Sequence, residues 1–325
     1  MSAGSHDGAP LAVYADVVEF DPAPGVRLLE EAGFAVRVLS SGDPARIRDE
    51  AAGAAALLVS YARVDAELLA GLPDLGIVAT QSVGFDMVDL DAARARGVWV
   101  SNVPGAATEE VAVHAFAMGL SLLRGLPFLD RAVRAGRWNS AELPLWRPSA
   151  ATLGILGLGR IGRRLGGIAG GVYGRVIGHD PLLDPAAWPA GVERVSLDEL
   201  LDASHVVSLH LPLTPATHHV VDAAALARMR PGALLVNVSR GALVDADALL
   251  AALDSGRLGG AALDVLVREP PAPDDPLPRH PRVLITPHAA YFSDQAAPAH
   301  VVEQARNVVA WRREGRPRDV VVDPR

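Results

Sequence analysis

The stretch LGILGLGRIG, residues 153–162, decides the fold of this chain. Its apolar first residues, 153–156, predict a buried strand, and residues 160–169 predict a helix directly after the glycines. A G-x-G-x-x-G pattern at such a turn is typical of a dinucleotide-binding βα unit, in which the first glycine permits the tight turn, the second lets the backbone approach a pyrophosphate, and the third lets helix and strand pack closely. The stretch therefore predicts a Rossmann domain.

The helix that follows the glycines offers free N–H groups and a favourable dipole to phosphate oxygens. The residues expected to contact the cofactor at this turn are Gly157, Gly159, Arg160, Ile161 and Gly162.

The next predicted strand, residues 175–179, ends at Asp180, eighteen residues after Gly162. An acid at this distance is expected to hydrogen-bond the hydroxyls of the adenine ribose, although an aspartate can also simply cap a turn. Pro181 follows Asp180, and no Arg or His is there to accept a 2′-phosphate. The sequence therefore predicts NAD in preference to NADP.

Strands alternate with helices on both sides of this motif, which predicts parallel α/β sheets. Before the motif we expect strands at residues 11–18, 35–39, 54–60, 76–81 and 98–101, with helices at 25–32 and 65–72. After it we expect strands at 206–210, 233–238, 260–263 and 283–286, and a last helix at 298–314 that can return to the first domain. A length of 325 residues suits two domains.

A long apolar segment separates the two series. Residues 108–123 predict one helix, which its apolar character places between domains or in a subunit interface. Residues 125–150 are punctuated by Pro and Trp and predict a loop-rich connection.

Composition excludes several kinds of protein. The net charge of −8, with no dense basic block, argues against nucleic-acid binding. There is no cysteine, so disulfides, thiolate metal sites and cysteine nucleophiles are excluded, and we predict no metal site. All 30 basic residues are arginine, which removes lysine as a Schiff base. No apolar run reaches the roughly 20 residues that span a membrane. Residues 1–10 predict a loose tail without a signal-peptide core, which favours a cytoplasmic protein.

Three polar residues follow predicted strands near the C-terminal side of the second series. Arg240 lies in NVSRG, Glu269 in AALDVLVREPP, and His288 in TPHAA. Each has an ordinary alternative, because an isolated Arg usually forms a surface salt bridge and a lone His is usually structural. Ligands of open α/β sheets bind outside the carboxyl ends of the strands, where all three are expected to lie.

Together these residues suit hydride transfer to a 2-keto acid. His288 can donate a proton to the developing alkoxide, because imidazole titrates near neutral pH. Glu269 would orient the ring and favour its charged form. Arg240 would hold the substrate carboxylate through a bidentate pair and polarise the carbonyl.

With these motifs in order, the chain resembles the NAD-dependent D-isomer-specific 2-hydroxyacid dehydrogenases from about residue 57 to residue 317. The similar stretches are SVGFDMVDLDAARARGVWVSNVPGAATEEVAVHA, ATLGILGLGRIG, HLPLTPATHHVVD, NVSRGALVDADAL, AALDVLVREPP and TPHAAYFSDQA. The resemblance implies the catalytic roles just given for Arg240, Glu269 and His288.

The resemblance also implies a two-domain architecture. A discontinuous, flavodoxin-like substrate domain, residues 1–102 and 290–325, would accompany an NAD-binding domain, residues 103–289, with the active site in the cleft between them. Further cofactor contacts would come from His210, Leu211, Pro212, Thr217 and Val238, and from Asp264 to the nicotinamide amide. Substrate contacts would come from Arg240 and from the backbone of Val83 and Gly84. The helix from Thr108 and the following loop would form a homodimer interface.

The branch of the family is less sharply indicated. TPHAAYFSDQA is most similar to the branch of the C-terminal-binding corepressors, which has Trp where this chain has Tyr291. The arginines of the phosphoglycerate branch are replaced by Val59-Ser60-Tyr61, which predicts a neutral pocket walled by Tyr61 and Tyr291. We therefore expect an enzyme acting on a small 2-keto or D-2-hydroxy acid. The alternative is an NAD(H)-sensing scaffold or regulator.

Overall fold

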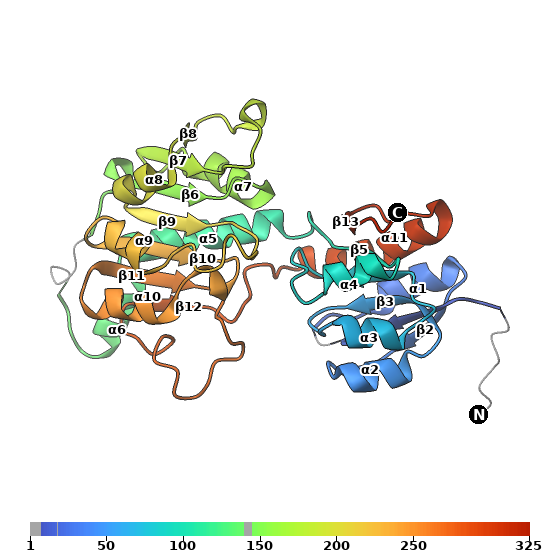
Figure 1. Ribbon diagram of the computed structural model, residues 1–325. Coiled ribbons are helices and arrows are strands. Elements are labelled where there is room, and N and C mark those ends of the chain that lie inside the picture. The colour runs from blue at the N-terminus through green and yellow to red at the C-terminus, as the bar shows by residue number, and fades with distance from the viewer. Residues whose placement is uncertain (1–7, 18, 140–144) are drawn as a thin grey trace. The chain divides into compact units, whose positions relative to one another are not determined.

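The computed structural model describes residues 8–17, 19–139 and 145–325. The expectations for residues 1–7, for the strand end at Val18 and for the loop residues 140–144 therefore lie outside the described residues. The chain forms two compact units: Met1–Ala107 with Phe292–Arg325, and Thr108–Tyr291 (Figure 1). The predicted divisions after residues 102 and 289 each come a few residues before those in the structure.

The first unit is built on a six-stranded sheet with the order β13-β5-β4-β3-β1-β2. Strands β1 to β5 are parallel and follow the flavodoxin-like order, while β13 pairs antiparallel with β5. The strands are β1 (Leu11–Tyr14), β2 (Ala35–Val38), β3 (Ala54–Val59), β4 (Ile77–Thr80), β5 (Trp99–Ser101) and β13 (Val320–Val322).

Helices cover both faces of this sheet, because successive strand residues point to opposite sides. On β3, Leu57 belongs to one buried cluster and Leu58 to the other. The first cluster includes side chains of three helices, α2 (Pro44–Glu50), α3 (Ala66–Gly71) and α4 (Leu90–Ala95). The second includes side chains of α1 (Ala23–Glu31) and α11 (Ala296–Glu314). The C-terminal helix thus belongs to the first unit.

The second unit is built on a seven-stranded parallel sheet with the order β12-β11-β10-β9-β6-β7-β8. Counted within the unit, this is the Rossmann order with one added strand, and the order reverses between β6 and β9. The strands are β6 (Thr152–Leu156), β7 (Arg175–His179), β8 (Glu193–Arg194), β9 (Val206–Leu209), β10 (Ala233–Asn237), β11 (Leu258–Leu263) and β12 (Val283–Ile285).

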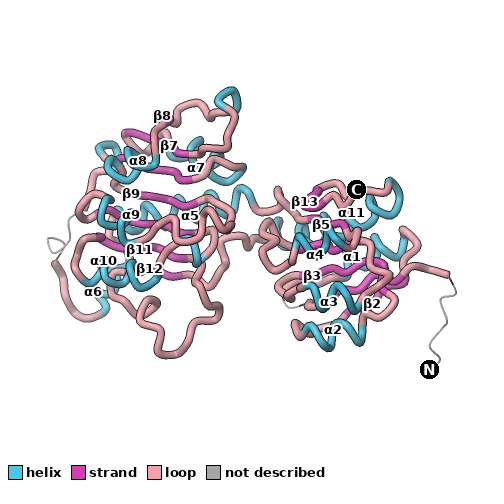
Figure 2. Tube along the Cα trace, viewed as in Figure 1, coloured by secondary structure: helices cyan, strands magenta, loops and turns pink. Residues whose placement is uncertain are grey.

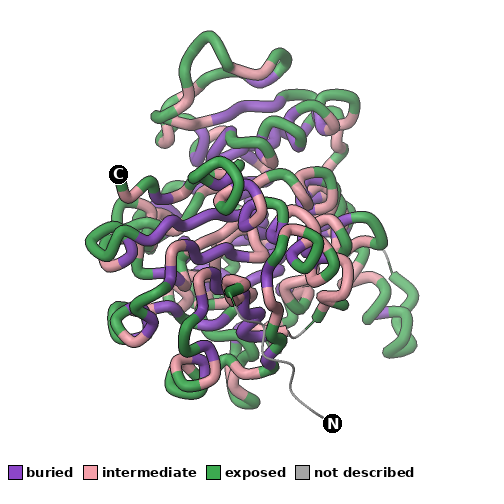
Figure 3. The backbone as a smooth tube through the Cα atoms, turned by 90° about the vertical axis from the view of Figure 1, so that its right-hand side faces the viewer, coloured by how far each residue is buried: buried purple, intermediate pink, exposed green. Residues whose placement is uncertain are grey.

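Three helices pack on one face of this sheet through a leucine-rich cluster. They are α8 (Leu197–Ala203), α9 (Ala223–Arg228) and α10 (Ala246–Asp254), which Figure 2 draws in cyan beside the magenta strands. The long helix α5 (Thr108–Leu123) contacts β9, β10, β11 and α7 (Arg160–Ala169). In both units the strand residues are largely buried, and the exposed residues lie in loops and on the outer sides of helices (Figure 3).

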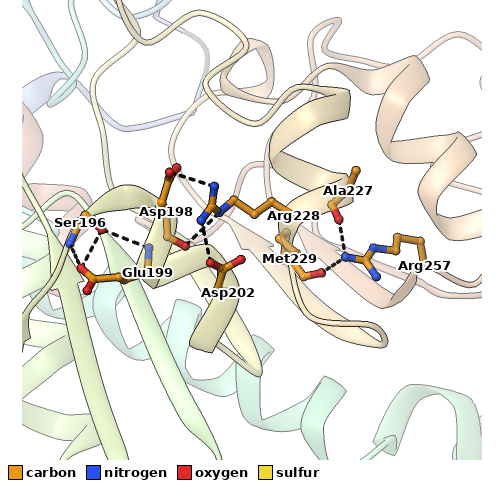
Figure 4. A network of polar contacts seen from close by, with 8 residues as sticks. All are labelled: Ser196, Asp198, Glu199, Asp202, Ala227, Arg228, Met229 and Arg257. Carbon is orange, nitrogen blue, oxygen red and sulfur yellow. Dashed lines mark hydrogen bonds and ion pairs between the residues drawn. The ribbon is translucent and has the colours of Figure 1, made fainter.

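Polar contacts connect α8 and α9 and cap their ends (Figure 4). Ser196 and Glu199 form a capping box that starts α8. Arg228, in the last turn of α9, forms ion pairs of 2.8 Å with Asp198 and 2.7 Å with Asp202 on α8. Arg257 donates hydrogen bonds to the carbonyl oxygens of Ala227 and Met229, which satisfies acceptors left free at the end of α9.

Two expectations about secondary structure are wrong. The segment predicted as a loop-rich connection contains helix α6 (Leu126–Arg134), which begins with a proline in its first turn, where its missing N–H costs nothing. The chain also does not end helically, because β13 follows α11. Within the described residues no single helix is long and apolar enough to cross a membrane, although α5 and α6 together meet that test across a 58° bend.

Candidate active site

The glycine-rich turn between β6 and α7 depends on glycine at two positions. Gly157 has φ +92°, and a Cβ there would lie 2.5 Å from the carbonyl oxygen of His210. A Cβ on Gly162 would lie 2.1 Å from the carbonyl oxygen of Gly157. Both distances are too short for any larger residue, so these glycines set the shape of the turn.

Gly159 differs from its neighbours because the space beside it is open. Among the described residues, no atom beyond Gly159 and its two chain neighbours lies within 4 Å of where its Cβ would be. Gly159 is the N-cap of α7 and supplies no side-chain hydrogen bond to the helix. The amides of the first turn, which begins with Arg160 and Ile161, therefore remain available to an anionic group. This arrangement fits the pyrophosphate of a dinucleotide.

Asp180 lies beside the same turn, at the end of β7. Its Oδ2 accepts a hydrogen bond of 2.8 Å from the amide of Leu158, inside the glycine motif. Its Oδ1 accepts hydrogen bonds of 3.0 and 3.2 Å from the amides of Leu182 and Leu183. The carboxylate therefore both caps its own turn and reaches the glycine motif. A role as a turn cap is thus compatible with the predicted contact to the cofactor.

His210 follows β9 on the other side of Gly157. Ser208 Oγ lies 2.8 Å from its Nε2. Burial lowers the pKa of His210 to about 3, so the ring is neutral at physiological pH. Its buried Nδ1 has no hydrogen-bond partner among the described residues, which is uncommon for such an atom. A polar atom of a bound cofactor would satisfy it.

The other predicted cofactor residues after β9 and β10 are placed as follows. The hydroxyl of Thr217 closes the turn that begins at Leu211, because it donates to the carbonyl oxygen of Pro212 at 2.7 Å and accepts from the amide of Thr214 at 2.8 Å. Val238, just past β10, is buried. No cofactor contact of these residues is defined by the geometry alone.

Arg240 lies in the loop after β10, which local contacts hold closely. Asn237 donates to the carbonyl oxygen of Arg240 at 2.8 Å, and Ser239 Oγ donates to that of Leu209 at 2.8 Å. A Cβ on Gly241 would lie 2.0 Å from the backbone carbon of Leu266. Glycine therefore lets the Arg240 loop pack against the backbone that follows β11.

Glu269 is tied to that same backbone. Its Oε1 accepts a hydrogen bond of 2.7 Å from the amide of Leu266, and its Oε2 lies 2.6 Å from Nδ1 of His288. Burial alone would raise the pKa of Glu269, but the hydrogen bonds from His288 and Leu266 and the charge of Arg240 together lower it below its usual value. The structure thus brings all three predicted catalytic residues together, with the carboxylate ionised.

The ring of His288 has a defined orientation. Because Glu269 is ionised, Nδ1 carries the proton of the 2.6 Å hydrogen bond, and Nε2 is left for a reacting group. The side chain is 29% exposed, so solvent or a substrate can reach it. His288 has φ +52°, a conformation that non-glycine residues adopt rarely and that recurs at functional sites. The ring of Tyr291 lies edge-on, 6.0 Å from that of His288.

Asp264 holds this unusual backbone in place. Its carboxylate accepts hydrogen bonds from Thr286 Oγ1 at 2.5 Å and from the amides of Ala289 and Ala290, both at 2.9 Å. Its backbone carbonyl accepts from the amide of His288 at 2.8 Å. The side chain has no exposed surface, so its predicted contact with a nicotinamide amide stays a prediction and would require rearrangement.

The predicted substrate residues of the first unit lie in loops after β3 and β4. Tyr61 is 49% exposed. The carbonyl oxygen of Val83 accepts from Asn102 Nδ2 at 2.7 Å, and that of Gly84 accepts from Ser82 Oγ at 2.6 Å. Within the described part of the chain, the amides of Val83 and Gly84 donate to no acceptor. They are therefore available to an anion.

Sequence reasoning missed the residues that support the site. Thr286, Asn237 and Gly241 are adjacent to predicted residues, but their roles depend on contacts across the sheet. His114, on α5, lies with Nε2 3.1 Å from Thr286 Oγ1, and only the polar interruption of an apolar helix could have indicated it.

Comparison with known proteins finds relatives over most of the chain. The NAD-binding-domain model of the D-isomer specific 2-hydroxyacid dehydrogenases matches residues 116–290. The chain is 40% identical to a glyoxylate reductase of Korarchaeum cryptofilum over 79% of each protein. Two solved structures are each 30% identical. A D-lactate dehydrogenase from Aquifex aeolicus, complexed with NAD and lactic acid, has a TM-score of 0.86 and aligns over 97% of this chain and 100% of that one. An NADPH-dependent glyoxylate/hydroxypyruvate reductase from Sinorhizobium meliloti, in complex with NADP and malonate, has a TM-score of 0.85 and aligns over 98% of both chains.

Proposed function

Since the chain belongs to the D-isomer specific 2-hydroxyacid dehydrogenase family, a family of oxidoreductases with an NAD-binding domain, we propose that it interconverts a small 2-keto acid and the D-2-hydroxy acid at His288, Glu269 and Arg240. The observation that carries the proposal is the 2.6 Å contact between His288 Nδ1 and an ionised Glu269 that also feels the charge of Arg240. An isolated surface ion pair would not place a third charged residue of a different loop beside it.

Bound NAD(H) supplies the hydride in reduction and accepts it in oxidation. The residues that would hold it are those of the glycine-rich turn, the first turn of α7 and Asp180, with His210 beside them.

His288 manages the proton of the reaction. In reduction the protonated ring donates from Nε2 to the substrate oxygen as negative charge develops on it, and in oxidation the neutral ring takes the proton of the hydroxyl. Glu269 stabilises the protonated ring through Nδ1 and fixes its orientation. A proton donor held in place in this way contributes roughly 10²- to 10⁴-fold to the rate.

Arg240 binds the substrate. Its guanidinium presents parallel N–H donors that match a carboxylate, and its charge favours the oxyanion that forms from the carbonyl. The free amides of Val83 and Gly84 support a second contact to the carboxylate, and Tyr61 and Tyr291 support a neutral pocket wall. Orientation by several groups matters because a displacement of about 1 Å can cost about 10²-fold in rate.

We also propose that NAD is preferred over NADP. The carboxylate of Asp180, held beside the glycine motif by the amide of Leu158, would accept ribose hydroxyls and repel a 2′-phosphate. One of the related reductases takes NADP, so this preference belongs to the individual chain and needs its own measurement.

A homodimer is the proposed assembly, with α5 and the segment after it at the interface. Large apolar side chains on these elements are exposed, which is costly in water unless a partner covers them. They are Val113, Leu126, Val133 and Trp138, exposed by 45%, 58%, 48% and 90%. Light scattering after gel filtration tests this directly, because a monomer mass would contradict it. A cytoplasmic location stays a prediction from the sequence.

The experiment that tests the activity follows NADH absorbance with a panel of keto acids: glyoxylate, hydroxypyruvate, pyruvate, 4-methyl-2-oxopentanoate and phenylpyruvate. Turnover of at least one of them supports the proposal. Tight NADH binding with no turnover on any of them contradicts it and favours the alternative of an NAD(H)-sensing scaffold.

A further inference from the structure

A polar side chain interrupts the apolar helix α5. Residues 111–123, VAVHAFAMGLSLL, contain only two polar side chains, His114 and Ser121. The side chain of His114 is 27% exposed. Leucine would suit such a helix better, because its helix propensity is higher and its burial needs no hydrogen-bond partner. The imidazole therefore requires an explanation other than packing.

His114 belongs to a chain of hydrogen bonds that ends at a buried carboxylate. Its Nε2 lies 3.1 Å from Thr286 Oγ1 and 3.8 Å from Oδ1 of Asp264. Thr286 Oγ1 donates to that same carboxylate oxygen at 2.5 Å. A hydroxyl has a single hydrogen, and Thr286 uses it toward Asp264, so Nε2 must carry the hydrogen of the bond between His114 and Thr286. The donation therefore runs in one direction, from His114 through Thr286 to Asp264.

The carboxylate at the end of this chain holds the backbone beside the catalytic histidine. Asp264 accepts hydrogen bonds of 2.9 Å from the amides of Ala289 and Ala290, and its backbone carbonyl accepts from the amide of His288 at 2.8 Å. His288 has φ +52°, a conformation that persists only where its surroundings enforce it. The direction of the catalytic ring thus depends on how firmly the carboxylate is held.

We propose that His114 is a positioning residue for the reaction at His288, acting through Thr286 and Asp264. Its N–H fixes the Thr286 hydroxyl toward Asp264, and successive hydrogen bonds in such a chain strengthen one another. Without this donor the hydroxyl can turn to other acceptors, which loosens the hold on the backbone after His288. All four residues lie in the second unit, and the inference rests on the proposed dehydrogenase function.

The loss of this donor should affect the rate more than the stability. His114 is partly exposed, so water can replace its hydrogen bond to Thr286 at little net cost. The rate is more sensitive, because misplacement of a reacting group by about 1 Å costs about 10²-fold, and a shift of about half that size costs about tenfold. A merely structural role would instead lower the Tm and leave kcat unchanged.

The test compares His114→Leu with His114→Gln, using the keto acid that the wild-type protein reduces fastest. Leucine removes the donor, whereas glutamine carries an amide N–H at a similar distance from the backbone. We expect His114→Leu to lower kcat about tenfold, equivalent to about 1.4 kcal/mol, with little change in KM, in the Kd for NADH or in Tm. His114→Gln should restore most of the lost rate. Ser121→Ala, two turns further along α5 on the same face, is the matched control and should leave kcat unchanged.

A double variant tests the route from His114 to His288. If His114 acts through Thr286, then Thr286→Val already removes its influence, and adding His114→Leu should lower kcat no further. Two losses that simply add in the double variant would overturn the route through Thr286. His114→Ala, which adds no bulk, provides the same comparison if the leucine variant does not fold.

The outcomes distinguish this inference from the proposed function. An active wild-type protein whose kcat is unchanged by His114→Leu overturns the role of His114 and leaves the dehydrogenase proposal intact. Equal losses in His114→Leu and His114→Gln, or a loss explained entirely by weaker NADH binding, overturn it as well. Absence of turnover of every keto acid by the wild-type protein removes the proposed function and this inference with it.

Discussion

Gly162→Ala is a small change with a consequence that the structure makes calculable. The new Cβ would lie 2.1 Å from the carbonyl oxygen of Gly157, whereas ordinary contacts begin near 3.4 Å. Neither atom belongs to a flexible side chain. The backbone of the glycine-rich turn must therefore move by about 1.3 Å, or α7 must move away from β6.

Such a displacement misaligns the amides that face the pyrophosphate. Misplacement of about 1 Å typically costs about 10²-fold. We therefore expect the Kd for NADH to rise about 100-fold, equivalent to about 2.7 kcal/mol. Overpacking should also lower the free energy of unfolding by roughly 1–3 kcal/mol.

The assay is NADH binding by fluorescence titration, with circular dichroism to confirm that the variant is folded. Gly167→Ala in the same helix is the matched control, because among the described residues no atom other than its chain neighbours and the nearby backbone of α7 lies within 4 Å of its new Cβ. That control should bind NADH as the wild type does and gain about 0.5–1 kcal/mol of stability from helix propensity. A folded Gly162→Ala protein with wild-type NADH affinity would refute the assignment of the glycine-rich turn as the site of the pyrophosphate.

Further predictions concern the charged residues around the site. Because the pKa of Glu269 is lowered, its carboxylate stays ionised at pH values below the usual glutamate pKa of about 4.3. Glu269→Gln removes the carboxylate that orients the His288 ring through the 2.6 Å contact, so kcat/KM for reduction should fall by roughly 10²-fold, and an unchanged kcat/KM would contradict this. Thr286→Val removes a donor to buried Asp264 and should lower the free energy of unfolding in urea by about 1–3 kcal/mol, whereas no change would show that the hydrogen bond is unimportant. Asp180→Ser should raise the ratio of NADPH to NADH activity at least tenfold, measured as kcat/KM for each cofactor, and a constant ratio would count against its role in cofactor choice.

The elements that sequence predicts best are those with clear local signals. The bounds of α7 and β7 agree with those predicted. Glycines flank α7 on both sides, and each element begins with an arginine, so the sequence marks where they start. The short helices α2 and α4 were missed, since six or seven residues carry too little periodicity to show a buried face. Strand β13 has β-branched residues, but its three valines are too few to predict a strand and its pairing partner β5 lies more than 200 residues earlier.

For the catalytic residues too, local patterns could be predicted from the sequence, whereas contacts between distant segments could not. Arg240, Glu269 and His288 could be selected because each follows a strand and the three suit one reaction. The contact that brings Arg240 to the backbone beyond β11 depends on Gly241, which a sequence reader sees only as a flexible residue. The burial of Asp264 depends on donors from a later loop, so its role as an anchor of His288 could not be foreseen.

The decisive measurement is the rate of keto-acid reduction by His288→Ala, with NADH affinity determined on the same preparation. We expect kcat/KM for the best keto acid to fall by roughly 10²- to 10⁴-fold while the Kd for NADH changes by less than about twofold, because the lost group donates a proton to the substrate and does not hold the cofactor. A folded His288→Ala protein that keeps wild-type activity would contradict the assignment of His288 as the proton donor. A loss of activity explained entirely by weaker NADH binding would contradict it equally.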